Sequence, residues 1–412
     1  MTTRVGITGI GLITPLGNDT ASTWEAARAG RSGIAPITRF DSSRHGVHIA
    51  GEVKGFDPLD YMDRKEARRT ERFIQFALAA ASQAMDDSRL DVGAMPDDVG
   101  VVIGSGRGGL QTIEEQFHVL FERGHDRISP FFITMMAEDM ASGMVSMRYG
   151  ARGPNFATVS ACATSAHAIG ESFEIIRRGD AKAMITGGSE ACITSMAVAA
   201  FDNMRALSRR NDDPPAASRP FDDQRDGFVL AEGAGVLILE DLEMAAARGA
   251  PIYAEVVGYS ATADAHHITE PAPEGAGLAR ALRRALKKAN LAPEDVEYIN
   301  AHGTSTRFND RDETAAIKSV FGEHAYKLAV SSSKSMSGHM VGAAGAMETA
   351  LTALALRDGI LPPTINYQYP DPECDLDYVP NTARTADIRV ALSNSMGFGG
   401  HNAVVALKKY EG

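Results

Sequence analysis

Short apolar runs that end in glycine alternate with longer stretches of helical periodicity along the chain. Runs of this kind, rich in Val, Ile and Ala and closed by a turn, are typical of strands buried on both faces. We expect strands at residues 4–11, 99–106, 181–188, 251–260, 296–303 and 327–334. Helical patterns, such as that of residues 275–291, lie between them. The alternation predicts an α/β protein with helices on both faces of its sheets.

The two halves of the chain follow one plan. Residues 157–180 and 327–359 both begin as a strand, continue through small residues and end as a helix with a basic residue and glycine at its close. The direct identity between them is weak, so an internal duplication is a hypothesis. It would place Cys162 and the segment around Lys334 and His339 at equivalent positions in two facing halves.

Composition narrows the class of protein. The chain has 412 residues, three cysteines and a net charge of −12. The odd and sparse cysteines argue against a disulfide framework and for a reducing compartment. We see no signal peptide and no apolar run of the roughly 18 residues that span a bilayer. We therefore expect a cytoplasmic protein without a membrane span, and its acidity argues against nucleic-acid binding.

Two short motifs have more than one interpretation. The basic stretch "DRKEARRTER" at 63–72 is typical of a solvated helix face, and the alternative is a docking patch for an acidic partner. The motif "GSGRGG" at 104–109 follows a strand and fits a dinucleotide fingerprint. No acidic residue ends a second strand about 20 residues further on, so we do not expect NAD.

Cys162 lies among small residues in "TVSACATSAHAIG". The pattern predicts a strand ending at Ser160 and a helix over 163–178, which puts the thiol at a helix N-terminus on a sharp turn. Unpaired N–H groups and the helix dipole would favour a thiolate there, and small neighbours would admit a substrate. The alternative is a small buried cysteine with a packing role.

Two histidines and a lysine strengthen the catalytic interpretation. His302 follows a strand in "INAHGTST", while Lys334 and His339 lie in "SSSKSMSGHMVGAAGA". Each is flanked by Gly, Ser and Ala, so bulky side chains are absent where a substrate would need room. Near the C-terminus, "SNSMGFGGHN" adds a glycine loop around Phe398 whose backbone can approach a ligand closely.

The motifs "ACATSAHAIG", "NAHGTST", "KSMSGHMVGAAGA" and "GFGGHN", in this order, resemble the β-ketoacyl-acyl-carrier-protein synthases. The resemblance covers essentially the whole chain and is strongest to the elongating condensing enzymes (type II) of bacterial fatty-acid synthesis. It implies a thiolase fold with two duplicated βαβαβαββ halves in five αβαβα layers, and a homodimer. We expect residues 1–250 to form the half with the nucleophilic cysteine and 251–412 the half with the two histidines.

The same resemblance implies a decarboxylative Claisen condensation by an acyltransferase. Cys162 would hold the acyl chain, and the backbone N–H groups of Cys162 and Phe398 would hold its oxyanion. Neutral His302 and His339, with Nε2 protonated, would donate to the malonyl carbonyl. Lys334 and Glu348 match a supporting ion pair, and Phe398 matches a gating phenylalanine.

Further residues match the substrate-binding parts of the family. Thr304, Thr306 and, less closely, Thr269 would bind the phosphopantetheine arm of an acyl-carrier protein, with no permanently bound cofactor and no metal. The docking candidates for that carrier are Arg64, Lys65, Arg68, Arg69 and Arg205. The acyl pocket would include Arg107, Ile133 and Glu138.

The chain departs from the family at Arg107, Glu138, Arg307, Phe308 and Met396. The family usually has apolar residues at 107 and 138, so these two side chains could pair and reshape the acyl tunnel. The departures put the chain-length preference in question, but not the reaction.

Four alternatives remain. A polyketide ketosynthase uses the same residues as fatty-acid elongation. A thiolase would need a second catalytic cysteine near the C-terminus, where only Cys374 is available, in the acidic loop "DPECDLD". A non-catalytic chain-length subunit usually lacks the nucleophilic cysteine. A Cys-His hydrolase would lack a dry acyl tunnel beside the thiol.

Overall fold

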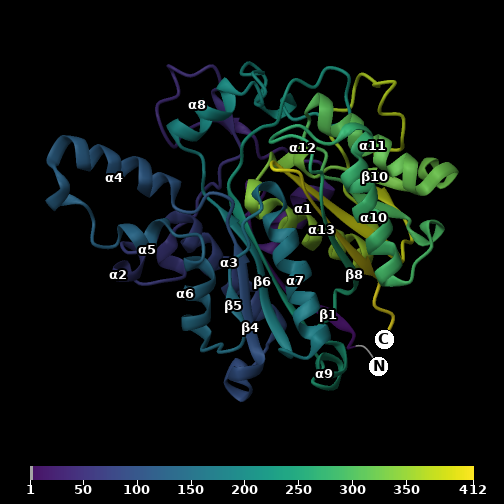
Figure 1. Cartoon of the computed structure of the whole chain (residues 1–412), viewed down its shortest axis with the longest axis horizontal. Helices are drawn as coiled ribbons and strands as arrows, with labels where there is room; N and C mark the ends of the chain where they lie inside the picture. The colour runs from purple at the N-terminus through teal and green to yellow at the C-terminus, as the bar shows by residue number, and fades with distance from the viewer. Residues whose placement is uncertain (1–2) are drawn as a thin grey trace.

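Ten strands form one mixed sheet in the computed structural model, which describes residues 3–412 (Figure 1). The first half of the chain contributes β1 (Val5–Ile13), β4 (Val99–Gly104), β5 (Asn155–Phe156), β6 (Ala183–Glu190) and β7 (Gly233–Asp241). The second half contributes β8 (Ala254–Ala263), β9 (Tyr298–Asn300), β10 (Ala329–Ser331), β13 (Val390–Gly397) and β14 (His401–Lys408). Short two-stranded sheets pair β2 (Ala35–Pro36) with β3 (Ile49–Ala50), and β11 (Ile360–Leu361) with β12 (Arg384–Thr385).

The strand order repeats. It reads β10-β9-β13-β14-β8-β1-β7-β6-β4-β5, so the order β5-β4-β6-β7-β1 of the first half matches β10-β9-β13-β14-β8 of the second. The directions match too: β4 is parallel to β5 and β6, as β9 is to β10 and β13, and the remaining pairs in each half are antiparallel. The halves join where β1 pairs with β8. Residue 250, where we expect the first half to end, lies between β7 and β8.

Helices cover both faces of each half-sheet. Helix α3 (Arg72–Ser88) packs on β1 and β7, and α10 (Ala276–Ala289) packs on β8 and β14. Between the half-sheets lie α7 (Thr164–Arg178) and α13 (Ala344–Asp358), which contact one another. Helix α10 is amphipathic, whereas Ala344 to Leu356 of α13 are buried on every side, as a central layer requires. The five layers are those expected from the sequence.

The remaining helices surround this frame. They are α1 (Thr20–Arg28), α2 (Arg64–Ala67), α4 (Leu110–Arg123), α5 (Phe132–Met136), α6 (Met140–Tyr149), α8 (Ser195–Asn203), α9 (Leu242–Ala247), α11 (Arg307–Phe321) and α12 (Lys334–Ser337). Within residues 3–412, every helix is too short or too polar to cross a membrane.

The turn before each central helix is also repeated. A 3₁₀ turn at Ala161–Ala163 leads into α7, and one at Val341–Ala343 leads into α13. Ala161 and Val341 both have left-handed backbone angles, with φ of 51° and 44°. This conformation is strained for a residue with a side chain, and for a β-branched valine above all. The predicted strand before Cys162 is shorter than expected, since β5 ends at Phe156 and residues 157–160 form no strand.

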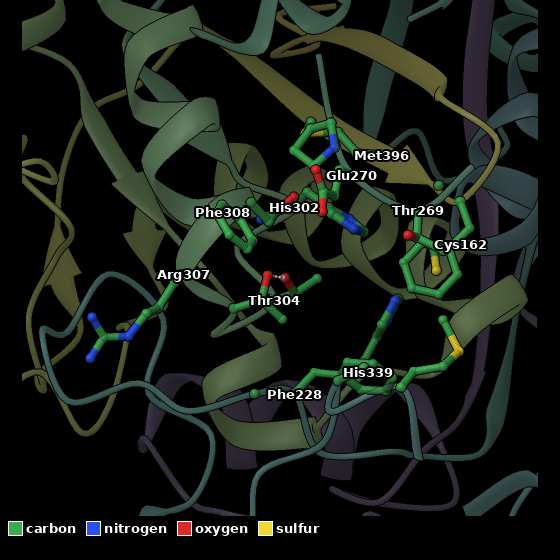
Figure 2. Close-up of a pocket in the computed structure, with 18 of the residues that line it drawn as sticks. Cys162, Phe228, Thr269, Glu270, His302, Thr304, Arg307, Phe308, His339 and Met396 are labelled. Carbon is green, nitrogen blue, oxygen red and sulfur yellow. Dashed lines mark hydrogen bonds between the residues drawn. The ribbon is translucent and has the colours of Figure 1, made fainter. Parts of the chain in front are cut away.

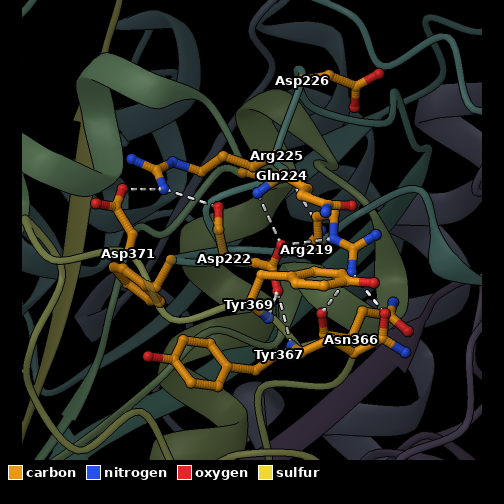
Figure 3. Close-up of polar contacts among 12 residues, drawn as sticks. Arg219, Asp222, Gln224, Arg225, Asp226, Asn366, Tyr367, Tyr369 and Asp371 are labelled. Carbon is orange, nitrogen blue, oxygen red and sulfur yellow. Dashed lines mark hydrogen bonds and ion pairs between the residues drawn. The ribbon is translucent and has the colours of Figure 1, made fainter.

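A buried polar network joins two loops of the chain (Figure 3). Asp222 accepts hydrogen bonds from Arg219 Nε at 3.0 Å and from the backbone N–H of Gln224 at 2.9 Å. Its second oxygen accepts from the backbone N–H groups of Gln368 and Tyr369, each at 2.7 Å. One buried carboxylate therefore joins residues 219–224 to residues 368–369.

Arg225 continues the network toward the other half. Its Nη1 donates to Asp371 Oδ2 at 2.6 Å, and its Nε and Nη2 donate to the carbonyls of Thr306 at 3.2 Å and Arg307 at 3.1 Å. The loop that carries Thr306 is thus held by a buried guanidinium rather than by regular secondary structure.

We expect Asp222→Asn to lower the free energy of unfolding by about 3–5 kcal/mol, because it leaves the buried Arg219 guanidinium without its anion. Urea unfolding followed by circular dichroism measures the change. The control is Asp223→Asn, an exposed neighbour that should change stability by less than about 0.5 kcal/mol. Equal stability of the two variants would contradict the role given to Asp222.

Candidate active site

A cavity of about 600 Å³ contains Cys162 together with residues from both halves of the chain (Figure 2). Among the residues expected from the sequence, its lining includes Cys162, His302, His339, Phe398, Thr304, Thr306, Thr269, Arg107 and Arg205. The lining does not include Lys334, Glu348, Arg64, Lys65, Arg68, Arg69, Ile133 or Glu138. The fold thus gathers most of the expected reactive groups around one space.

Cys162 lies in the 3₁₀ turn that precedes α7. The backbone at Gly397 approaches it so closely that a Cβ there would lie 3.2 Å from the Cys162 nitrogen and 2.7 Å from the Ser160 oxygen. A side chain at 397 would therefore push the glycine loop away from the thiol. This approach brings the backbone N–H of Phe398 to the Cys162 sulfur.

Burial raises the pKa of the Cys162 thiol to about 11, although the charges of Lys334 and Arg107 oppose the shift. The expectation that the helix N-terminus keeps a resting thiolate is therefore wrong. Desolvation of the anion outweighs the favourable charges around it. At neutral pH the Cys162 side chain is therefore a thiol.

His302 is oriented by a buried ion pair behind it. Lys334 Nζ donates to the His302 carbonyl at 2.6 Å and to Nδ1 of the His302 ring at 3.3 Å, and it also pairs with Glu348. Because Nδ1 accepts, the ring proton of a neutral His302 lies on Nε2. Burial, and then the nearby Lys334 charge, lower the pKa of His302 well below its usual value, so the imidazole is neutral.

His339 is buried, and its ring contacts Phe228 and His302 edge-on at centroid distances of 5.4 Å. Neither of its ring nitrogens has a hydrogen-bond partner among residues 3–412. Burial and the Lys334 charge lower the pKa of His339 as well. A neutral, unpaired imidazole beside a cavity is a donor and acceptor that a ligand can use.

Glu313 and Phe228 belong to this site but were not expected from the sequence. Glu313, on α11, accepts hydrogen bonds from the backbone N–H groups of His302 at 2.9 Å and Gly303 at 2.8 Å, and from Asn394 Nδ2 at 3.1 Å. In the polar stretch "NDRDETAA" it looks like a solvated helix residue. Only the packing of α11 against the sheet shows that it holds the His302 loop.

The mouth of the cavity is polar and carries charges of both signs, since Asp226 and Glu270 are exposed there as well as two arginines. The hydroxyl oxygens of Thr304 and Thr306 lie 3.0 Å apart, and Thr269, from the loop before α10, lines the same cavity. Arg205 and Arg307 are exposed at the rim. Phe308, 54% exposed, lies beside them with the Arg311 guanidinium 5.4 Å above its ring.

The other docking candidates lie apart from this mouth. Arg64, Lys65, Arg68 and Arg69 are exposed on and just after α2, near α5 (Figure 1). The Arg69 guanidinium lies 4.7 Å above the Phe131 ring. Within one chain, only Arg205 of the docking set borders the cavity.

The three acyl-pocket candidates are separated as well. Arg107 lines the cavity, whereas Ile133 is 64% exposed on α5 and Glu138 lies in the turn after α5. Arg107 and Glu138 do not form the expected ion pair in the described part of the chain, residues 3–412. A backbone carbonyl, that of Gly106, holds Arg107 instead at 2.9 Å.

Metal-binding clusters of His, Cys, Asp and Glu are absent from residues 3–412. The groups around the cavity are a thiol, two neutral imidazoles and backbone N–H groups.

Comparisons with known proteins agree with this arrangement. Residues 2–245 match the family model "Beta-ketoacyl synthase, N-terminal domain", and residues 253–368 match "Beta-ketoacyl synthase, C-terminal domain". The chain is 54% identical to a 3-oxoacyl-[acyl-carrier-protein] synthase 2 of Synechocystis sp., over 99% of this chain and 98% of that protein. It is 55% identical to the same-named protein of Staphylococcus aureus, over 99% of both chains.

A solved type II polyketide ketosynthase in complex with its acyl-carrier protein is similar in structure. The TM-score is 0.92 with 35% identity, and the match covers 100% of both chains. The fold is therefore the thiolase fold of ketosynthases. With two family models that together match most of its length, the chain belongs to the β-ketoacyl synthase family.

Proposed function

We propose that the protein catalyses the decarboxylative Claisen condensation of fatty-acid elongation, joining an acyl chain on Cys162 to malonyl-acyl-carrier protein. The observation that carries this proposal is the cavity that Cys162 shares with two neutral histidines, one of which has no hydrogen-bond partner among the described residues. The 54–55% identity to proteins named 3-oxoacyl-[acyl-carrier-protein] synthase 2 supports the same reaction.

Acyl transfer to Cys162 comes first. The thiol sulfur attacks the thioester carbonyl of the acyl carrier, and the carrier's pantetheine thiol leaves with the proton that Cys162 gives up. The backbone N–H groups of Cys162 and Phe398 hold the oxyanion that forms, and the close approach of Gly397 sets their spacing. Because the pKa of Cys162 is about 11, proton loss accompanies attack rather than preceding it.

Decarboxylation of the malonyl group comes second. Carbon dioxide leaves, and the electrons of the broken carbon–carbon bond form an enolate whose oxygen takes hydrogen bonds from His302 and His339. Preorganised donors of this kind typically contribute about 2.7–4 kcal/mol each to a transition state. Lys334 fixes the Nε2 proton on His302 without entering the cavity, so it is a positioning residue.

Condensation completes the cycle. The enolate carbon attacks the acyl carbonyl on Cys162, the carbon–sulfur bond breaks, and the released Cys162 thiolate takes a proton from solvent. The product is a 3-oxoacyl thioester on the carrier. Thr304, Thr306 and Thr269 line the same cavity, which supports their proposed role in binding the phosphopantetheine arm that carries the malonyl group.

The carrier itself is the proposed partner. Arg205 lies at the mouth, and the basic stretch at 64–69 is exposed, so an acidic carrier finds local attraction on a chain of net charge −12. The similar polyketide ketosynthase was solved with its acyl-carrier protein, which supports this mode of delivery.

A second copy of the chain is the other proposed partner. Strand β5 has one neighbour in the sheet and is exposed at its edge. Exposed apolar side chains lie on this strand, on the loop after it and on the nearby helices, namely Phe117, Leu120, Phe121, Ile133, Met147, Phe156 and Val159. An apolar surface with an open strand edge is typical of a subunit interface.

The three free cysteines fit a reducing cytoplasm.

The alternatives fit less well. Cys374, which a thiolase would need, is buried and does not line the cavity. Cys162 is present, unlike in most non-catalytic partner subunits. Identity to the elongating synthases, at 54–55%, exceeds the 35% identity to the polyketide ketosynthase.

We expect Cys162→Ser to abolish condensation, because a hydroxyl is a far weaker nucleophile than a thiol in this site. Mass spectrometry of the intact protein should show an acyl adduct on Cys162 of the parent and none on the variant. Cys192→Ala, which changes another buried cysteine, should still load. An adduct on Cys192 or Cys374 of the parent would contradict the assignment.

We expect His302→Ala and His339→Ala to slow malonyl decarboxylation by about 10²–10³-fold, the value of one lost donor. Loading of Cys162 should change only a few-fold, since neither histidine takes the thiol proton. Release of carbon dioxide from malonyl carrier and intact-mass loading measure the two steps separately.

The parent's decarboxylation rate should also show no step near pH 6.5, the usual pKa of histidine, because both imidazoles stay neutral there. Loss of loading with decarboxylation retained, in either variant, would reverse the proposed roles.

We expect the double reversal Arg68→Glu/Arg69→Glu to raise the KM for carrier-bound substrate several-fold, and this effect should fade as salt screens the charges. Turnover of a short pantetheine thioester should stay nearly the same. The control Arg31→Glu/Arg44→Glu changes the net charge equally at exposed sites elsewhere. Equal losses on both substrates would show that the stretch has only a structural role.

A further inference from the structure

Arg107 is a charged side chain on the apolar side of the Cys162 cavity. It lies in the turn between β4 and α4, and its Cζ atom lies 5.9 Å from the centre of the Phe201 ring. Phe201, Phe228 and Val341 belong to one apolar cluster, against which Cys162 and Phe398 also pack. All of these residues line the cavity, so the guanidinium faces the same space as the sulfur.

The backbone before Arg107 is held next to the nucleophile turn. A Cβ on Gly106 would lie 3.4 Å from the Ala161 carbonyl oxygen and 3.2 Å from Val341 Cγ1. The Gly106 N–H donates to Glu190 at 2.9 Å. Gly106 contacts the turn that carries Cys162, and Arg107 is the next residue of the chain. The Arg107 side chain therefore begins close to this turn, within reach of an acyl group on the Cys162 sulfur.

The guanidinium has no carboxylate partner within residues 3–412. Its one hydrogen bond runs from Nη1 to the Gly106 carbonyl at 2.9 Å. Glu190 is occupied by backbone donors, the N–H groups of Gly106 and Gly342, and is not among the cavity-lining residues. Glu138 packs beside Gly108 instead, where a Cβ would lie 3.1 Å from its Cγ.

An unpaired guanidinium in such a place discriminates between acyl chains. An alkyl chain laid against it would displace water from the cation and offer no acceptor in return, which is costly. A carboxylate offers two oxygens that match the planar fork of arginine. Phe201 and Val341 would still pack against the methylene groups that lead to that carboxylate.

From this geometry we infer that Arg107 is a specificity-determining residue, and that the cavity accepts acyl groups whose far end carries a carboxylate, that is, the monothioesters of dicarboxylic acids longer than malonate. The inference rests on the proposed function, because it concerns the acyl group that Cys162 takes up. The far carboxylate pairs with Arg107 and does not react.

The chemical step is unchanged by this substrate. A carbon–sulfur bond forms between Cys162 and the acyl carbonyl, and the bond to the carrier thiol breaks. The thiol proton passes to the released carrier thiolate. The far carboxylate is not β to the thioester, so it is not lost as carbon dioxide, and its charge is the same before and after transfer.

Competition for Cys162 tests the inference directly. The parent protein is offered carrier-bound acyl groups of equal length that end in a methyl group, a carboxylate or a primary amide, and intact-mass spectrometry measures the ratio of adducts. The same mixture is given to Arg107→Met, Arg107→Lys and the exposed control Arg31→Met. Thermal melting confirms that each variant is folded.

We expect the ratio of carboxylate-ended to methyl-ended adducts to fall roughly ten- to a hundredfold in Arg107→Met, the value of hydrogen bonds to a charged group. Arg107→Lys should retain part of the preference, and Arg31→Met all of it. The amide-ended group should load more slowly than the carboxylate-ended group on the parent, because it lacks the charge.

The same carboxylate-to-methyl ratio in the parent and in Arg107→Met would overturn the inference. A change only in the preferred length of methyl-ended chains would also overturn it and make Arg107 a steric plug. If methyl-ended chains load and the parent shows no preference for the carboxylate-ended group, the inference fails while the proposed function stands. Failure of every acyl group to load on Cys162 would overturn the proposed function together with this inference.

Discussion

Backbone contact between α7 and α13 is the constraint on which the rest of the site depends. A Cβ on Gly345 would lie 2.9 Å from the Ala166 nitrogen, and the Ala346 N–H donates to Ser165 Oγ at 2.9 Å. Two helices approach this closely only where their facing residues are Gly, Ala and Ser. Because both helices start from the same kind of turn, their contact brings the turn of Cys162 and the turn after His339 to one cavity.

Burial then decides the protonation of the groups in that cavity. It lowers the pKa values of His302 and His339 and raises that of Cys162. The Lys334–Glu348 pair lies outside the cavity lining. The Glu348 carboxylate neutralises the buried Lys334 ammonium, and Lys334 orients the His302 ring. The result is a site of neutral reacting groups, suited to a reaction whose negative charge appears only when the substrate is attacked or loses carbon dioxide.

Under the proposed function, residues on the cavity wall around these groups select the substrate. Helix α11 and the buried Arg225 hold the threonine loop at the mouth, where a carrier-borne arm would enter. Arg107 stands at the apolar side, where the acyl group would lie. Under the proposed function, the reacting groups belong to the repeated frame, whereas the choice of substrate rests on single residues in its loops, which can change without disturbing the sheet.

Sequence patterns were enough to predict the α/β class, the repeated strand–turn–helix unit and the motifs of Cys162, His302 and His339, because periodicity and small-residue turns are local properties. Its motifs also pointed to the family and its thiolase fold. Other features depended on side chains that meet only in the folded chain. Glu313 looked solvated in its helix, yet it accepts the N–H of His302. Arg107 and Glu138 looked like partners, yet a backbone carbonyl holds the arginine. The helix N-terminus suggested a thiolate at Cys162, but desolvation, which only tertiary packing creates, keeps the proton on the sulfur.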